Sequence, residues 1–261
     1  LNKITGGKIF FKLENLQITN SFKYRGATHK IMKLSNKSKK NGIVAYSSGN
    51  HAQAVAYAAK IHNIDAKIVI PNNAPKIKIK NTKKYGAKVI LYNPLKEERE
   101  NIAKEIAKIE KRTIIKPYDD YDIIAGQGTA AKEIYIDLLK LNIIPDLYLC
   151  CCGGGGLIAG TSTYLKKKYP KLLCYSVEPL GFEDTQKSLM AGKIIPNIAN
   201  KISICDALLA PEPGKITFQI NKKNLTGGLV VSDKEVKKSI ITLAENLKTI
   251  IEPGGAVAAA S

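Results

Sequence analysis

Four consecutive glycines, Gly153 to Gly156, directly follow an apolar run and directly precede a segment of helical pattern. A glycine loop at a helix N-terminus presents unshielded backbone N–H groups, which bind phosphate. The loop is not a Walker motif, because no Lys-Ser/Thr follows, nor a GxGxxG motif, because the spacing differs. Four glycines are costly to order unless a ligand must approach the backbone, so a phosphate site is favoured over a flexible turn.

A lysine begins the helical segment of the sequence SFKYRGA, residues 21–27. A position near a helix N-terminus disfavours the protonated form of Lys23. A neutral amine can form a Schiff base with an aldehyde. By spacing alone, a solvated surface charge is the more common role for one lysine of a lysine-rich chain.

The sequence SSGNHAQ, residues 47–53, is a third polar turn between a strand and a helix. Ser48, Asn50 and the backbone N–H groups offer hydrogen-bond donors to a carboxylate or a phenolate. His51 is a candidate general acid or base, and a capping or core histidine is the equal alternative. The turn therefore predicts a second place for an anionic group.

Short β-branched runs alternate with longer segments of helical period, which predicts an α/β fold with open, mostly parallel sheets. The expected strands are 9–13, 43–46, 66–70, 87–91, 113–115, 146–151 and 172–177. The expected helices are 23–34, 50–62, 75–85, 95–110, 122–141 and 157–168. Ser232 and Glu235 form a capping box that begins a further helix ending near residue 250.

Residues 44–118 hold enough of these elements for a small βα subdomain. It is expected to be nested in a larger domain made of residues 1–43 and 119–261, whose C-terminal part is incomplete. Ligands bind beyond the carboxyl ends of strands in open α/β sheets, so the site is expected in the cleft between the two domains.

The composition of the 261 residues, 44% hydrophobic and 24% charged, is that of a globular protein. The longest nearly uncharged stretch, residues 141–165, contains Pro145 and four glycines, so no membrane association is expected. The net charge of +19 comes from scattered lysines without interleaved aromatics, so no nucleic-acid partner is expected. Five cysteines, including adjacent Cys150, Cys151 and Cys152, favour a reduced, cytoplasmic setting.

Taken together and in this order, the three motifs resemble those of the fold-type II pyridoxal-phosphate enzymes, in particular the threonine/serine dehydratase and serine racemase branch. The resemblance covers nearly the whole chain. It extends to four further landmarks: AGQGT (125–129), VEP (177–179), ICDALLAPEPGKITF (204–218) and IEPGGAVA (251–258). It implies a tryptophan synthase β-like fold with pyridoxal 5'-phosphate in the cleft between two domains.

The resemblance also implies roles for individual residues. Lys23 would carry the cofactor in covalent linkage and then remove the substrate Cα proton, and Ser48 matches the second base of racemases. The cofactor-binding residues would be Phe22, Lys23, Asn50, Gly153, Gly154, Gly155, Gly156, Leu157 and Glu252. The substrate carboxylate would be received by Ser47, Ser48, Asn50 and His51.

The resemblance also implies a divalent-cation site, because Glu178 and Asp184, six residues apart in VEPLGFED, match the pattern of two carboxylates and a backbone carbonyl in racemases and dehydratases. The carbonyl oxygen of Phe182 would complete it. Oxygen ligands favour Mg²⁺, Ca²⁺ or Mn²⁺. Two acidic residues on a solvated turn are the alternative.

The activity implied is that of a threonine/serine ammonia-lyase, which converts L-threonine to 2-oxobutanoate or L-serine to pyruvate, with release of ammonia. Tyr118 resembles the aromatic residue of dehydratases, whereas Arg99 occurs in racemases as well. Serine racemase, 3-hydroxyaspartate ammonia-lyase and a non-catalytic basic binding protein on the same fold are the alternatives. A homodimer or homotetramer is expected. The family's terminal Ser-Gly-Gly-Asn loop does not follow Ser261, so the chain is expected to be a fragment.

Overall fold

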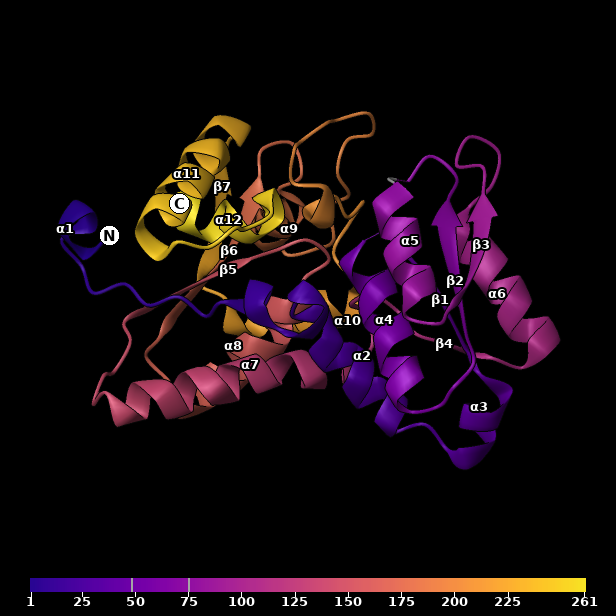
Figure 1. Ribbon diagram of the computed structural model, residues 1–261. Helices are drawn as coiled ribbons and strands as arrows, with labels where there is room; N and C mark the ends of the chain where they lie inside the picture. Colours follow the sequence, from indigo (N-terminus) through magenta and orange to yellow (C-terminus); the bar gives the residue numbers. More distant parts are fainter. Residues whose placement is uncertain (48, 75) are drawn as a thin grey trace. The chain divides into compact units, whose positions relative to one another are not determined.

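The computed structural model describes residues 1–47, 49–74 and 76–261. It contains two compact units, which we describe separately (Figure 1). The smaller unit is Gln17–Gln127, and the larger unit combines Leu1–Leu16 with Gly128–Ser261. Each unit contains a parallel sheet with helices packed on it, which confirms the expected α/β fold. No helix of the described residues is long and apolar enough to cross a membrane.

The smaller unit carries the elements from residue 17 to the start of α7. They are η2 (Ile18–Asn20), α2 (Lys23–Met32), α3 (Asn36–Asn41), β1 (Ile43–Tyr46), α4 (Asn50–Ile61), β2 (Ala66–Pro71), α5 (Lys76–Lys84), β3 (Lys88–Tyr92), α6 (Arg99–Glu110), β4 (Thr113–Ile114) and α7 (Tyr121–Lys140), which continues into the larger unit. The strand order is β3–β2–β1–β4. The sheet strands expected within residues 44–118 all lie in this unit, which begins earlier in the chain, at Gln17, and ends later, at Gln127.

Strand β1 shows how the smaller unit is layered, because successive side chains of a strand point to opposite faces of the sheet. Ile43 and Ala45 pack in a cluster with residues of α2, α4 and α5. Val44 and Tyr46 pack on the other side with residues of α6. All four strand residues are buried, as expected for a central parallel strand covered by helices on both faces.

The larger unit has the strand order β5–β6–β7. Its elements are α1 (Asn2–Thr5), η1 (Glu14–Leu16), the second part of α7, β5 (Leu147–Cys151), α8 (Gly156–Lys168), β6 (Leu173–Pro179), α9 (Asp184–Ala191), η3 (Asp206–Leu208), α10 (Lys215–Asn224), β7 (Gly227–Val231), α11 (Asp233–Leu247) and α12 (Pro253–Ala260). The expected capping box of Ser232 and Glu235 begins α11.

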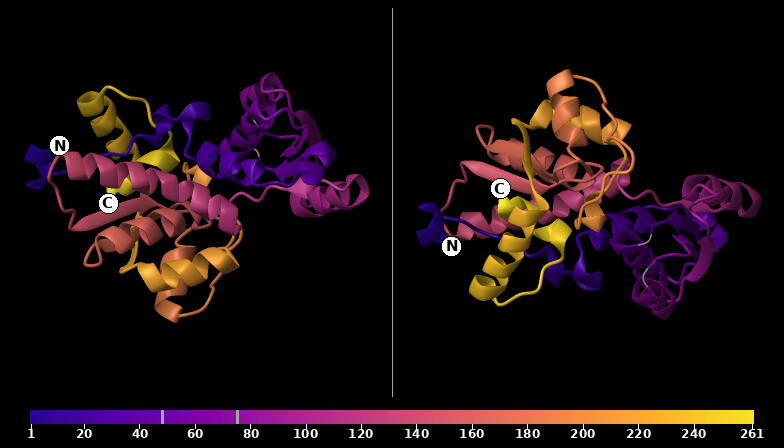
Figure 2. Two further views of the ribbon diagram at one scale, coloured as in Figure 1. Left: turned by 90° about the horizontal axis from the view of Figure 1, so that it is seen from below. Right: turned by 90° about the horizontal axis from the view of Figure 1, so that it is seen from above.

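Strand β6 separates the two helical layers of the larger unit. Val177 packs in a cluster with residues of α11 and α12, whereas Cys174 packs with residues of α7 and α8. Helices α7 and α8 lie side by side (Figure 2). The ring centroids of Tyr135 in α7 and Tyr164 in α8 are 6.3 Å apart. The glycine loop between β5 and α8 is therefore held between packed elements.

The expected strand at residues 9–13 is wrong. The segment is neither helix nor strand, and Ile9 and Phe10 are 38% and 51% exposed, whereas Phe11 packs against the cluster that contains Val177. It is tied to the larger unit by side chains instead, since Lys12 pairs with Glu133 and Asn15 donates to Thr249 and Ile250. The apolar and aromatic composition of the segment does not make a strand when no neighbouring strand pairs with it.

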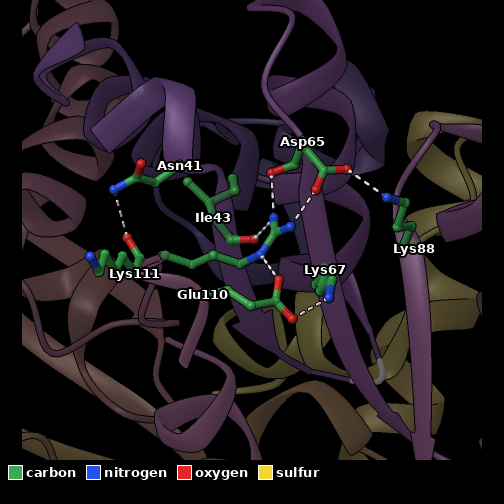
Figure 3. Close-up of polar contacts among 8 residues, drawn as sticks. Asn41, Ile43, Asp65, Lys67, Lys88, Glu110 and Lys111 are labelled. Atoms are coloured by element: carbon green, nitrogen blue, oxygen red, sulfur yellow. Dashed lines mark hydrogen bonds and ion pairs between the residues drawn. The ribbon is translucent and has the colours of Figure 1, made fainter. Parts of the chain in front are cut away.

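Arg112 links the beginnings of β1 and β2, and Figure 3 labels its partners Ile43, Asp65 and Glu110. Its guanidinium donates to the carbonyl oxygens of Ile43, the first residue of β1, and Asp65, which directly precedes β2, at 3.4 and 3.1 Å. It also pairs with the carboxylates of Asp65 and Glu110, and Glu110 binds Lys67 of β2. Partial burial acts to raise the pKa of Asp65, but Arg112 and Lys88 together lower it.

Candidate active site

Lys23 is the first residue of α2, and its backbone N–H donates to Ser21 Oγ at 3.3 Å. Its Nζ donates to the carbonyl oxygen of Pro117 at 2.7 Å and lies 5.2 Å from the ring centroid of Phe22. Burial lowers the pKa of Lys23 to about 8, because a charged amine is poorly solvated there. The amine is therefore available as a base or nucleophile near neutral pH.

Helix α2 is held against α7 by close backbone contact. A Cβ atom added at Gly26 would lie 2.8 Å from the carbonyl oxygen of Ile123, and one at Gly126 would lie 2.6 Å from Gly26 Cα. The buried side chain of Gln127 accepts a hydrogen bond from the N–H of Gly26 at 3.2 Å. The small residues of RGA and AGQG thus let the two helices touch, which fixes the helix that carries Lys23.

His51 lies in the first turn of α4 with only 3% of its surface exposed. Its Nε2 is 2.9 Å from the carbonyl oxygen of Ile115. A carbonyl can only accept, so we assign the proton to Nε2 and leave Nδ1 as an acceptor. Burial first, and then the charge of Lys23, lower the pKa of His51 to about 3. His51 is therefore a neutral, oriented group rather than one that titrates near pH 7.

The other residues of SSGNHAQ lie where β1 ends and α4 begins. Ser47 Oγ accepts a hydrogen bond from the N–H of Gly49 at 3.2 Å, and Asn50 is the first residue of α4. Ser48 lies outside the described residues. The structure thus brings Ser47, Asn50 and His51 to one end of the sheet in the smaller unit.

The glycine loop occupies residues 153–156, between Cys151 at the end of β5 and the start of α8 at Gly156. Gly155 has a left-handed backbone with φ of 85°, and a Cβ atom there would lie 2.7 Å from Asn221 Nδ2. A Cβ atom on Gly153 would lie 3.2 Å from Leu208 Cα. The loop needs glycine for its conformation and for these close approaches, and Leu157 follows in the first turn of α8.

The thiols of the three cysteines before this loop are free. Burial raises the pKa of Cys151 to about 11, and it also raises those of Cys150 and Cys152. These side chains are therefore protonated structural groups near pH 7.

Glu252 is the residue that precedes α12, and its side chain is exposed. Its negative charge is among the lesser influences that raise the pKa of Cys205, after burial. The structure therefore places a carboxylate at the N-terminus of α12 in the larger unit.

The two acids of the expected cation site are both fully buried. The carboxylate of Glu178 accepts the N–H groups of Thr185 and Gln186, each at 2.8 Å, and Asp184 Oδ1 accepts from Asn197 at 2.6 Å. Burial raises the pKa of Glu178 to about 8 and that of Asp184 to about 7, and the charge of Asp184 adds to the effect at Glu178. Within the described residues, Asp184 Oδ2 has no hydrogen-bond partner.

Phe182, the third expected ligand, lies between these acids in the chain and is 8% exposed. The described part of the chain contains no group of three or more His, Cys, Asp or Glu side chains that could hold a metal ion. A cation there would therefore depend on a backbone carbonyl and water in addition to the two carboxylates.

Several residues at the site were not expected from the sequence. Pro117 and Ile115 act through backbone carbonyls, which have no signature in side-chain identity. Thr217 and Asn221 of α10 hydrogen-bond to the glycine loop, at 2.7 and 3.3 Å. Their spacing of one helical turn is a sequence signal that becomes visible once α10 is recognised as a helix.

Each unit therefore supplies one kind of chemistry. The smaller unit has a buried lysine of lowered pKa beside a neutral histidine, which suits an aldehyde. The larger unit has a glycine loop leading into a helix, which suits a phosphate. A cofactor that carries both an aldehyde and a phosphate fits the residues present.

This combination on parallel α/β units defines an enzyme class that works through a lysine-bound aldehyde cofactor. The family model described as pyridoxal-phosphate dependent enzyme matches residues 1–261. The chain belongs to this family, which confirms the expected resemblance and the cofactor.

The chain is similar to relatives of more than one activity. It is 39% identical over 253 residues to an L-threo-3-hydroxyaspartate ammonia-lyase of Saccharomyces cerevisiae, covering 97% of this chain and 76% of that protein. It is 40% identical over 261 residues to a serine racemase of Schizosaccharomyces pombe, covering 100% and 79%. Among solved structures, the crystal structure of a T.th. threonine deaminase is 36% identical, with a TM-score of 0.94, covering 99% and 82%.

Proposed function

We propose that the chain is an ammonia-lyase for 2-amino-3-hydroxy acids, with L-threonine or L-serine as substrate. The observation that carries this proposal is the amine of Lys23, whose pKa is lowered to about 8 and which is held 2.7 Å from the Pro117 carbonyl. L-Threonine would give 2-oxobutanoate and ammonia, and L-serine would give pyruvate and ammonia. Relatives named for ammonia-lyase or deaminase activity support the reaction class.

Lys23 is proposed as the base that takes the proton from the substrate Cα through Nζ. Pyridoxal phosphate, when bound, supplies an electron sink for the negative charge left at Cα. The β-hydroxyl then leaves with a proton as water, and hydrolysis of the resulting enamine consumes water and releases ammonia and the 2-oxo acid. His51 is neutral, so its proposed part is to accept a hydrogen bond through Nδ1 rather than to carry charge.

The remaining residues are proposed to bind and orient. Gly153 to Gly156 and Leu157 would hold the cofactor phosphate at the start of α8. Phe22, Asn50 and Glu252 would contact the cofactor ring or its substituents, as the family resemblance implies. Ser47, Ser48, Asn50 and His51 would receive the substrate carboxylate, with His51 taking part through its backbone N–H because its ring proton is held by Ile115. Ser48 would act as the second base.

A second candidate is racemisation of serine or elimination from 3-hydroxyaspartate. It is supported by relatives of 39 and 40% identity whose names carry these activities. All the candidates begin with removal of a proton from Cα, so they share Lys23 and differ in what happens to the β-substituent.

We also propose a divalent cation, Mg²⁺, Ca²⁺ or Mn²⁺, at Glu178, Asp184 and the Phe182 carbonyl. The buried Oδ2 of Asp184, which has no hydrogen-bond partner among the residues that the structure describes, supports it. A rise in melting temperature with added cation, retained in the exposed Asp137→Asn control and lost in Asp184→Asn, would establish the site. An unchanged wild-type melting temperature with all three cations would exclude it.

A homodimer or homotetramer in the cytoplasm completes the proposal. The location is supported by five cysteines that are all free thiols, and the assembly by the family resemblance. Light scattering on the purified protein would decide the assembly, and a monomer would overturn that part.

The test of function compares wild type with Lys23→Ala and with Lys33→Ala, a matched control at the exposed end of the same helix. Absorbance reports the lysine-bound cofactor, and oxo acid, ammonia and D-serine are measured with L-threonine, L-serine and L-threo-3-hydroxyaspartate. We expect oxo acid from threonine or serine in wild type and Lys33→Ala only. D-Serine alone, or oxo acid from hydroxyaspartate alone, would select the second candidate. No cofactor uptake in any protein would favour a non-catalytic binding protein.

A further inference from the structure

Two buried side chains of α10 hold the back of the glycine loop. Thr217 and Asn221 lie one helical turn apart and are both 0% exposed. Thr217 Oγ1 donates to the carbonyl oxygen of Gly154 at 2.7 Å, and Asn221 Nδ2 donates to that of Gly155 at 3.3 Å. The N–H of Gly214, just before α10, approaches the same Gly154 oxygen at 3.4 Å.

These bonds fix two peptide planes of the loop. In a trans peptide unit, the carbonyl and the N–H of the next residue point in opposite directions. The Gly154 carbonyl is directed to α10, and the Gly155 carbonyl accepts both from Asn221 and from the N–H of Ala159 in α8, the latter at 2.9 Å. The N–H groups of Gly155 and Gly156 therefore point away from these donors. Those N–H groups lie at the N-terminus of α8, where the helix dipole also favours an anion.

The same contacts restrict what can stand at the loop. A Cβ atom on Gly155 would lie 2.7 Å from Asn221 Nδ2 and 3.1 Å from Thr217 Oγ1. The close approach of α10 therefore requires glycine, and glycine in turn makes the loop flexible in the absence of restraint. Hydrogen bonds from α10 supply the restraint.

We infer that Thr217 and Asn221 are positioning residues that preorganise the glycine loop for the cofactor phosphate. The inference rests on the proposed phosphate-binding role of Gly153 to Gly156. Neither side chain needs to touch the cofactor, because each acts through a loop carbonyl. Preorganisation raises affinity by removing the ordering cost from the binding step.

The experiment measures equilibrium dissociation constants of the apoprotein for pyridoxal phosphate and for pyridoxal, which lacks the phosphate. Thr217→Val removes the hydroxyl group while it keeps the shape of the side chain, and Thr217→Ser keeps the hydroxyl group. Asn221→Ala removes the second hydrogen-bond donor. Thr82→Val is the matched control, because Thr82 is also buried and its hydroxyl bonds only the Lys78 carbonyl of its own helix among the contacts described.

We expect Thr217→Val and Asn221→Ala each to raise the dissociation constant for pyridoxal phosphate about 3- to 10-fold, because each variant loses one hydrogen bond. The dissociation constant of these two variants for pyridoxal should stay within about 2-fold of the wild-type value, which is well under a tenfold change. Thr217→Ser and Thr82→Val should match wild type. The phosphorus NMR shift of the bound cofactor should change only in the two weakened variants.

The possible failures are distinguishable. The inference is overturned if Thr217→Val loses affinity equally for both ligands, or loses affinity for neither. In both cases the preference of wild type for the phosphorylated ligand still stands. Equal affinity of wild type for both ligands overturns the proposed phosphate site itself. If Thr217→Val does not fold, the comparison of Thr217→Ser with Asn221→Ala decides, since unchanged affinity in Asn221→Ala contradicts the inference.

Discussion

Lys23 Nζ lies 2.7 Å from the carbonyl oxygen of Pro117, ninety-four residues later in the chain. Two residues before Pro117, the carbonyl of Ile115 accepts from His51 at 2.9 Å. One short segment that follows β4 therefore positions side chains from both α2 and α4. The sheet of the smaller unit thus orients the two groups through backbone atoms.

The first prediction concerns the ionisation of Lys23. Only the neutral amine attacks an aldehyde, so the rate of cofactor uptake by the apoprotein should rise with pH and level off above a pKa of about 8. Uptake is followed by absorbance, and Lys33→Ala should show the same profile. A rate that does not change across this range would contradict the lowered pKa.

The second prediction concerns His51, whose pKa is lowered to about 3 from 6.5. Between these values the unfolded chain binds a proton that the folded chain does not. The free energy of unfolding should therefore fall as the pH drops below 6.5, and His51→Gln should lack that component. Denaturant unfolding at several pH values measures it, with His62→Gln as the control at the other end of α4. An identical pH dependence in wild type and His51→Gln would refute it.

The third prediction separates backbone strain from steric overlap at the glycine loop. Gly155 and Gly86 have nearly equal φ values of 85° and 89°, but a Cβ atom on Gly86 meets no heavy atom of the described residues within 4 Å. Gly86→Ala should cost about 1–2 kcal/mol of stability from the left-handed backbone alone. Gly155→Ala should lower stability more than Gly86→Ala does, and it should also cause loss of bound pyridoxal phosphate. Thermal unfolding and cofactor retention are the measurements, and equal effects of the two variants would be the contrary result.

The fourth prediction concerns the Arg112 cluster of Figure 3. Arg112→Gln should destabilise the protein by about 1–2 kcal/mol near pH 7, a value reduced for the solvent exposure of its carboxylate partners. Hydrogen bonds from Lys67 and Arg112 lower the pKa of Glu110, so its contribution is present at neutral pH and lost in acid. The difference in the free energy of unfolding between wild type and Arg112→Gln should therefore become smaller below about pH 4. Urea unfolding at both pH values tests this, and a constant difference would show that the carboxylates are not involved.

Most of the fold could be predicted because buried parallel strands leave a strong pattern. Residues 43–46 are apolar without interruption, and β1 is buried along its whole length. The pattern does not predict strand β7, because β7 begins with Gly227 and Gly228, residues that disfavour strands in isolation. A Cβ atom on Gly228 would lie 2.7 Å from Gln186 Cβ, so tertiary packing against α9 explains the glycine.

The site was predictable only where side-chain chemistry reveals it. Lys23 and the glycine loop have distinctive residues, and the family resemblance implies their roles. Helix α10 was not expected, since the landmark that ends at Phe218 covers only its first four residues and carries no conformation. Thr217 is not distinguished within that landmark, and Asn221 lies beyond it. The carbonyls of Ile115 and Pro117 belong to every residue alike, so only the structure distinguishes them.

The three cysteines before the glycine loop, of which Cys150 and Cys152 are buried, have a consequence for chemical selectivity. Aldehydes add to thiolates as well as to amines, and a thiolate next to Gly153 would compete for a cofactor bound at the loop. Because burial raises the pKa values of Cys150, Cys151 and Cys152, these sulfurs remain thiols near pH 7. Burial thus keeps the three cysteines in the less nucleophilic thiol form, whereas burial of Lys23 makes its amine easier to deprotonate.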